Sequence, residues 1–146
     1  MIEVEKTIMN SNPFFNLISN DKEELSPEEI KQEMLESQKI GAERYILQEE
    51  DHPIGILEYL MNNPNDGYPW LGLLVIKKEY QSQGYGVQAL QGFYNIMEER
   101  QVKAFRIGVI VENGPAHRFW RKQGFMEVTK KRWKDRKEVI VYEKRI

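Results

Sequence analysis

The stretch QSQGYG, Gln81 to Gly86, decides how this chain of 146 residues is organised. It follows the apolar run WLGLLVI and precedes a segment, Val87 to Met97, whose apolar residues recur at helical spacing. A strand, a glycine loop and a helix in this order bring the N–H groups of the loop and of the first helical turn to one point. Because glycine has no Cβ and the helix dipole is positive at its N-terminus, this arrangement favours a phosphate or pyrophosphate ligand.

Two other phosphate-binding patterns fit the same loop less well. A Walker A loop ends in Gly-Lys-Ser/Thr, which is missing here. The letters GYGVQA match the dinucleotide pattern G-x-G-x-x-G/A, and Glu112 follows the next strand, where an acid would bind a ribose hydroxyl. In that fold, however, the first glycine follows its strand almost at once, whereas seven residues separate Ile76 from Gly84. We therefore disfavour a dinucleotide site.

Length and composition indicate one soluble domain that spans residues 1–146. Hydrophobic residues make up 40% of the chain and charged residues 30%, a balance typical of globular proteins. The absence of cysteine excludes disulfides and a cysteinyl acyl-enzyme. The longest apolar run is far shorter than the ~20 residues of a membrane helix, and the N-terminus lacks the pattern of a secretory signal. We expect a cytoplasmic protein with no membrane partner.

Charge is distributed unevenly along the chain. Residues 1–66 carry a net charge of -10 and residues 67–146 a net charge of +8. The basic part, which contains the glycine loop, would favour an anionic ligand, and the acidic part a cationic one. The alternative is that both sets of charges lie on solvated surfaces.

The remaining segments predict a mixed α/β sandwich. We expect a strand in IEVEKTI near the N-terminus, and a helix with Ser26 as N-cap, Glu29 in a capping box, and an apolar face of Ile30, Met34 and Leu35. The further expected elements are strands RYILQE and IGILEYLM, a central strand PWLGLLVI covered on both faces, a strand AFRIGVIV, a helix between Asn113 and Gly124, and a closing hairpin of residues 125–133 and 138–144 around KDRK.

Two segments, LLVIKKEYQSQGYGVQAL and VIVENGPAHRFWRKQGF, resemble consecutive motifs of the GNAT superfamily of N-acetyltransferases. The first motif is a Gln/Arg-x-x-Gly-x-Gly/Ala loop. The second is a strand followed by Glu-Asn, Ala, an aromatic pair, Lys and Gly-Phe. Together they cover Trp70 to Phe125. The resemblance implies a single-domain fold with a mixed, mostly antiparallel twisted sheet, about four flanking helices, and a splayed parallel pair of strands that holds the cofactor.

The family uses acetyl-CoA as co-substrate, so the resemblance implies this ligand and no metal. The glycine loop would surround its pyrophosphate, the central strand would lie along its pantetheine arm, and the helix after Asn113 would border its other side. The cofactor-binding residues expected from the resemblance are Leu73, Leu74, Val75, Gln81, Ser82, Gln83, Gly84, Tyr85, Gly86, Val87, Asn113, His117, Trp120 and Lys122. Further cations that would meet its phosphates are Lys77, Lys78, Arg118 and Arg121.

The resemblance also implies direct transfer of an acetyl group to a primary amine in a ternary complex. We expect the backbone N–H of Leu73 to stabilise the carbonyl oxygen, with Gly72 marking a bulge that turns this group outward. Glu58 is the first candidate for the general base and Asp66 the second. Trp120 stands where many members have a tyrosine that protonates the thiolate, and an indole is no useful acid. A non-catalytic or weakly catalytic acyl-CoA-binding protein therefore stays open.

The acceptor is expected to be a small polar amine, with a cationic amine as one option. This expectation rests on the acids of the first part of the chain, namely Glu28, Glu29, Glu33, Glu58 and Asp66. A protein N-terminal or lysine acetyltransferase is the alternative, because the fold does not select the acceptor.

Three features receive an ordinary structural interpretation. His52 is expected in a turn, and His117 at the surface or beside the cofactor, with no metal-ligand spacing around either. The basic run KKRWKDRK, Lys130 to Lys137, is interpreted as a solvated hairpin tip rather than a nucleic-acid site. We expect a monomer or a homodimer.

Overall fold

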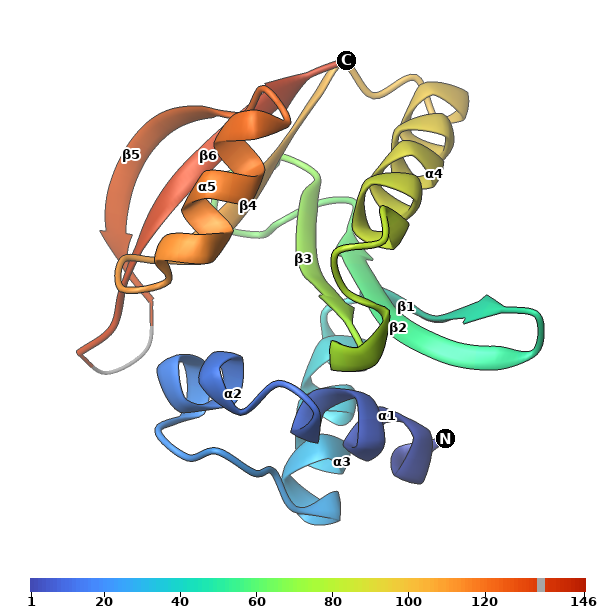
Figure 1. Cartoon of the computed structure of the whole chain (residues 1–146). Helices are drawn as coiled ribbons and strands as arrows, with labels where there is room; N and C mark the ends of the chain where they lie inside the picture. The colour runs from blue at the N-terminus through green and yellow to red at the C-terminus, as the bar shows by residue number, and fades with distance from the viewer. Residues whose placement is uncertain (134–135) are drawn as a thin grey trace.

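The protein is a six-stranded mixed sheet with helices on both faces (Figure 1). The computed structural model describes residues 1–133 and 136–146. The strand order is β1-β2-β3-β4-β6-β5, and every neighbouring pair is antiparallel except the parallel pair β3–β4. The strands are β1 Glu43–Glu49, β2 His52–Leu60, β3 Trp70–Ile76, β4 Ala104–Ile110, β5 Met126–Arg132 and β6 Glu138–Arg145.

The helices form two groups, one on each face of the sheet. One group consists of α1 Ile2–Asn10, α2 Pro13–Asn20 and α3 Pro27–Lys39, and the other of α4 Tyr85–Glu99 and α5 Gly114–Lys122; a 3-10 turn, Lys78–Tyr80, precedes the glycine loop. Residues of α1 and α3 pack on the β2–β3 face with Ile56 and Val75. Residues of α4 and α5 share a core with Phe105 and Tyr142 on the opposite face. These elements confirm the predicted fold class, with five α-helices in the described residues.

The parallel strands β3 and β4 stay together at one point and then separate. Within the described residues their registered pair is Trp70 with Arg106, next to a backbone hydrogen bond of 2.9 Å from the Arg106 N–H to the Pro69 carbonyl. Figure 1 shows the two strands diverging from there toward the N-terminal ends of α4 and α5. The expected splayed pair is therefore present.

A bulge at Gly72 lies directly beyond this pair. Leu71 is opposite Tyr59 and Leu73 is opposite Glu58, so Gly72 is the extra residue of β3. The insertion changes the side to which alternate residues point, because Leu71 packs in the α4–α5 core and Leu73 packs in the α1–α3 core. The bulge predicted at this glycine is confirmed.

The strand expected in IEVEKTI is wrong, because these residues form helix α1. Ile8 and Met9 are consecutive and both buried, against Ile30 of α3 and Ile56 of β2. A strand would send consecutive side chains to opposite faces, whereas a helix holds both on one broad face together with Glu5. Tertiary burial therefore overrides the weak alternation of the sequence.

Other local predictions are confirmed with small corrections. The Ser26 capping box starts α3, but Leu35 is 44% exposed and does not belong to its buried face. His52 opens strand β2 instead of lying in a turn. The closing hairpin is present as β5 and β6, while Lys134 and Asp135 of its expected tip lie outside the described residues.

Strand β3 is less covered than its apolar sequence predicts. Leu71 and Val75 are buried, but Gly72 is exposed and Leu73 and Leu74 are half-buried. The reason is the separation of β4 from β3, which opens one edge of this strand.

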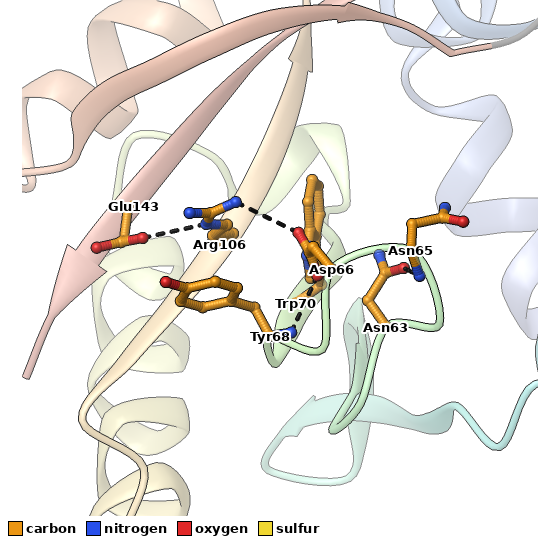
Figure 2. Close-up of polar contacts among 7 residues, drawn as sticks. All are labelled: Asn63, Asn65, Asp66, Tyr68, Trp70, Arg106 and Glu143. Atoms are coloured by element: carbon orange, nitrogen blue, oxygen red, sulfur yellow. Dashed lines mark hydrogen bonds and ion pairs between the residues drawn. The ribbon is translucent and has the colours of Figure 1, made fainter.

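An ionic cluster around Arg106 holds the loop between β2 and β3 at the point where the strands part (Figure 2). The Arg106 guanidinium contacts Glu143 of β6 at 3.1 Å and Asp66 of the loop at 3.4 Å, and it stacks 3.8 Å from the centroid of the Tyr68 ring. Asp66 also accepts hydrogen bonds from the Tyr68 N–H at 2.9 Å and the Trp70 indole N–H at 3.0 Å. One cation thereby ties β4, β6 and the loop together.

We predict that Arg106→Met lowers the free energy of unfolding by about 2 kcal/mol, measured by urea denaturation. The change leaves two partly buried carboxylates without their cation, and it costs less than a fully buried pair because both keep some contact with water. Arg145→Met, at an exposed position of the neighbouring strand, serves as the control and should stay within about 0.5 kcal/mol of the parent. Equal stability of the two variants would contradict the structural role of Arg106.

Candidate functional site

A cleft of about 840 Å³ opens where β3 and β4 separate. The glycine loop and the first turns of α4 and α5 border one end of this cleft, and α2, the β2–β3 loop and β5 border the other. Of the residues predicted from the sequence to bind the cofactor, the lining includes Leu73, Leu74, Gln81, Ser82, Gly84, Gly86, Val87, Asn113 and Trp120. It does not include Val75, Gln83, Tyr85, His117 or Lys122.

The glycine loop is anchored by the side chain of Gln81. Its amide nitrogen donates to the Asn12 side-chain oxygen at 2.6 Å and to the Ile76 carbonyl at 2.8 Å. Gln83 is also engaged, since its amide donates to the Glu79 carbonyl at 3.0 Å. These glutamines shape the loop, so a ligand of the loop would meet mainly backbone groups.

The two glycines of the loop have different surroundings, because Gly84 faces open space and Gly86 faces Phe119 of α5. Gly84, the N-cap of α4, has a φ of +88°, and no described atom lies within 4 Å of the position of a Cβ there. A Cβ on Gly86 would contact the Phe119 ring at 3.7 Å, an ordinary distance. The first-turn N–H groups of α4 have no partner within the helix and are free to bind an anion. The loop is therefore a suitable site for a pyrophosphate.

The start of α5 forms the facing border of the cleft. Asn113 is nearly buried, and its side-chain oxygen caps the helix by accepting the Ala116 N–H at 3.2 Å. Trp120 packs edge-on against Phe119 and Phe125, with ring centroids 5.0 and 4.9 Å away. Its indole thus stands between the aromatic core and the cleft, as expected for a residue beside the cofactor.

His117 is buried, so its predicted surface position is wrong. The side chain is 8% exposed, with Nε2 at 3.0 Å from the Ile110 carbonyl and 3.1 Å from the Val111 carbonyl, and Nδ1 at 2.7 Å from the Tyr142 hydroxyl. Carbonyls only accept, so we assign the proton to Nε2 and let Nδ1 accept from the hydroxyl. Burial raises the pKa of Tyr142, which keeps this hydroxyl protonated. His117 thus holds α5 against β4 and β6.

Glu58 lies beside the bulge and is ion-paired. Its Oε1 contacts Arg44 at 2.6 Å, and its Oε2 is 3.7 Å from the position of a Cβ on Gly72. Arg44 also contacts Glu5 at 2.6 Å. Burial lowers the pKa of Arg44, but the hydrogen bonds that its guanidinium donates to the carboxylates of Glu5 and Glu58 outweigh this effect and raise the pKa. Glu58 is thus held by a permanently charged guanidinium next to the most exposed part of β3.

The other acids named from the sequence do not line the cleft. Asp66 is engaged by Arg106 and Trp70 in the loop cluster. The acids of α3, Glu28, Glu29 and Glu33, border a separate shallow depression. The position of these side chains depends on tertiary packing, which the charge count along the sequence does not report.

The predicted phosphate-binding cations also lie outside the lining of the cleft. Lys77 is paired with Glu79 at 2.8 Å, and Arg121 contacts Glu127 at 3.7 Å. The remaining three, Lys78, Arg118 and Lys122, are exposed.

Sequence reasoning missed most of the end of the cleft that lies away from the glycine loop. The residues there are Phe15, Ser19, Asn63, Asn65, Trp70, Lys131, Trp133 and Val139. Lys131 and Trp133 belong to the basic run that was interpreted as a hairpin tip. The only sequence signal for them was the mixture of charge and aromatic side chains in that run.

Two negative findings apply to the described residues, 1–133 and 136–146. They contain no group of three or more His, Asp or Glu side chains placed to hold a metal ion. They also contain no helix with the length and apolar character needed to cross a membrane.

Comparisons with known proteins identify the family. The sequence profile described as the Acetyltransferase (GNAT) family matches residues 11–125, so the chain belongs to this family. No curated protein matches the chain in sequence.

Solved structures share the fold at low sequence identity. An acetyltransferase from Thermus thermophilus has a TM-score of 0.82 and 23% identity, over 99% of this chain and 90% of that one. An enzyme from Salmonella typhimurium that modifies the N-terminal serine of ribosomal protein L7/L12 has a TM-score of 0.77 and 19% identity, over 99% and 89%. The PaiA N-acetyltransferase from Thermoplasma acidophilum, in complex with coenzyme A, has a TM-score of 0.70 and 19% identity, over 99% and 92%.

We predict opposite effects of alanine at two glycines of α4 that both face open space. Gly84→Ala should lower the free energy of unfolding by about 1 kcal/mol, because an L-residue is strained at the observed φ of +88°. Gly92→Ala, in the middle of the helix, should raise it by about 0.5–1 kcal/mol through higher helix propensity. Urea denaturation measures both values, and a stabilising Gly84→Ala would contradict the left-handed cap.

Proposed function

We propose that this GNAT-family protein transfers the acetyl group of acetyl-CoA to a primary amine of a small polar acceptor. The observation that carries the proposal is the union of an anion-binding glycine loop with a cleft between two separating parallel strands. The coenzyme A found in the Thermoplasma relative supports the same ligand for this fold.

The residues of this chain suit acetyl-CoA along the cleft. We assign the pyrophosphate to backbone groups from Gln81 to Val87, where Gly84 leaves open space. We assign the pantetheine arm to the open edge of β3 from Leu73 to Val75. The amides of the pantetheine arm can form the hydrogen bonds that β3 lacks where β4 has moved away. Asn113 and Trp120 border the other side. His117 lies outside the cleft and holds α5 in place through its contact with the Ile110 carbonyl.

The proposed reaction is aminolysis of a thioester. The nitrogen lone pair of the neutral amine forms a bond to the carbonyl carbon, the carbon–sulfur bond breaks, and its electron pair leaves on sulfur. One proton leaves the nitrogen and one joins the thiolate, so the products are an acetamide and a thiol. With Trp120 at the position of the family tyrosine, water is the proposed source of the thiol proton. The N–H of Leu73, beside the Gly72 bulge, is the proposed donor to the carbonyl oxygen.

Glu58 is the proposed acceptor of the amine proton, through a water molecule. Its Oε1 is held by Arg44, while its Oε2 faces Gly72, the exposed residue of β3. The ion pair with Arg44 fixes the position of this carboxylate. Because Glu58 does not line the cleft, we propose that a water molecule carries the proton from the amine to its carboxylate.

Two other functions are each favoured by one observation. The Salmonella relative modifies the N-terminal serine of a ribosomal protein, which favours a protein N-terminus as acceptor. Trp120 in place of an acidic tyrosine favours a protein that binds acyl-CoA with little catalysis. Release of free thiol in the presence of amines separates catalysis from binding alone.

We predict that acetyl-CoA binds in the micromolar range or tighter and that Gly86→Asp abolishes the binding, measured by calorimetry. A carboxylate in the first turn of α4 would place negative charge beside the N–H groups assigned to the pyrophosphate. Gly92→Asp, at an exposed position about 1.7 turns further along the same helix, is the matched control and should bind normally. Unchanged affinity in a folded Gly86→Asp variant would remove the assignment of the loop.

We predict that Glu58→Gln lowers kcat/KM by about 10²-fold or more, while the rise of rate with pH, which comes from deprotonation of the acceptor amine, is retained. Glu5→Gln is the matched control, because Glu5 binds the same arginine but is 3% exposed and is not among the groups within 4 Å of a Cβ on Gly72. The measurement is the pH profile of thiol release for both variants. Equal losses in the two variants would show that Glu58 acts through the stability of Arg44 and not as a base.

A further inference from the structure

The end of the cleft away from the glycine loop has a chemical character of its own. It is built from α2, the β2–β3 loop, the start of β3 and the β5 strand with Trp133 after it. Its side chains are mostly aromatic, amide or hydroxyl groups, with one valine, Val139, and one lysine, Lys131.

Lys131 is the one formally charged side chain among the described residues that line the whole cleft. Its ammonium nitrogen lies 5.0 Å from the centroid of the Trp70 ring, within the range of a cation–π contact. The side chain is half-buried, whereas its neighbours Lys130 and Arg132 on β5 are exposed. Strand β5 therefore contributes one cation to the cleft and directs Lys130 and Arg132 to solvent.

The carboxylates close to this end of the cleft are already paired. Asp66 is bound by Arg106 and by the Trp70 indole, and Figure 2 shows it turned toward Arg106. Glu58 is bound by Arg44. The acidic surplus of residues 1–66 therefore does not reach the cleft, and the expected cationic acceptor finds no lining carboxylate there.

Lys131 also lies on the opposite face of the sheet from α4 and α5. Trp70 packs with Ile110, Val139 and Ile18 of α2, in a cluster separate from the core formed with α4 and α5. A Cβ on Gly108 would come within 3.3 Å of the Trp70 ring, so the glycine lets this ring lie flat against β4. The cation thus stands on the α2 side of the cleft, across the sheet from Phe119, which faces Gly86 of the phosphate loop.

We infer that the acceptor amine carries a carboxylate and an apolar group, as a free amino acid does, and that Lys131 pairs with the carboxylate. Trp70 and Trp133 supply flat apolar surfaces for the side group, and Asn63 and Asn65 supply amides for hydrogen bonds. This inference rests on the proposed acetyl transfer and specifies its acceptor. The amine of such a molecule would enter from the α2 side and meet the thioester at the bulge of β3.

The test compares amino acids with their carboxamides as acceptors, for example leucine with leucinamide and phenylalanine with phenylalaninamide. We expect a kcat/KM for the acids that is roughly tenfold or more above that of the amides, because a hydrogen bond between charged groups is lost in the amide. The amide has the larger fraction of neutral amine at neutral pH, so intrinsic reactivity would give the opposite order. A preference for the amides, or none at all, would overturn the inference.

Variants of Lys131 locate the preference. Lys131→Gln should remove most of the kcat/KM advantage of the acids over the amides, and Lys131→Arg should restore part of it. Lys130→Gln is the matched control, since Lys130 is an exposed neighbour on the same strand and contacts Glu138 at 3.8 Å. Equal behaviour of Lys131→Gln and the parent toward both acceptor types would contradict the role of Lys131.

A binding measurement separates this inference from the proposed function. N-acetyl-leucine and N-acetyl-leucinamide are titrated by calorimetry into the coenzyme A-loaded protein, which requires no turnover. Tighter binding of the acid that is lost in Lys131→Gln supports the carboxylate site even if no amine is acetylated, in which case the proposed transfer fails alone. Acetyl transfer to amines with equal binding of both ligands would retain the transferase and reject the carboxylate site.

Discussion

The site depends on one interrupted sheet ladder, the parallel pair that β3 and β4 form at Trp70 and Arg106 before they separate. Backbone N–H and C=O groups need partners, and an apolar strand such as β3 would normally obtain them from both neighbours. Where β4 moves away, the open edge of β3 faces a cleft instead of a strand. A ligand with its own amides can complete the ladder, so the binding surface is a consequence of the missing strand contacts.

Two local devices make this interruption stable. The Gly72 bulge lets a single apolar run contribute Leu71 to one core and Leu73 to the other, so the strand packs against both helical layers across the interruption. The Arg106 cluster fixes the β2–β3 loop to β4 and β6 at the point of separation. Trp70 connects these features. It is the first residue of β3, and its indole N–H donates to Asp66 of the Arg106 cluster. Its ring also lines the end of the cleft that is proposed for the acceptor.

Sequence reasoning succeeded where the determinants are local and failed where they are tertiary. The glycine loop, the Ser26 capping box and the Asn113 cap each involve only residues that are close in sequence. Their local structure can therefore be predicted from the sequence. Helix α1 forms because Ile8 and Met9 are buried against distant elements, and His117 is buried through partners on β4 and β6. No local sequence pattern predicts such contacts. The ion pair of Glu58 with Arg44 could not be predicted for the same reason, because the two residues lie on different strands.

The same distinction governs the electrostatics of the cleft. A net charge of -10 over residues 1–66 suggests an acidic pocket, but a carboxylate that is paired with a guanidinium contributes little field beyond that pair. Arg44 neutralises part of the charge of Glu5 and Glu58, and Arg106 does the same for Asp66. The charge near a bound ligand is set by the side chains that line the cleft. Among the described residues that line it, the one charged side chain is a lysine, and the surplus acids lie elsewhere.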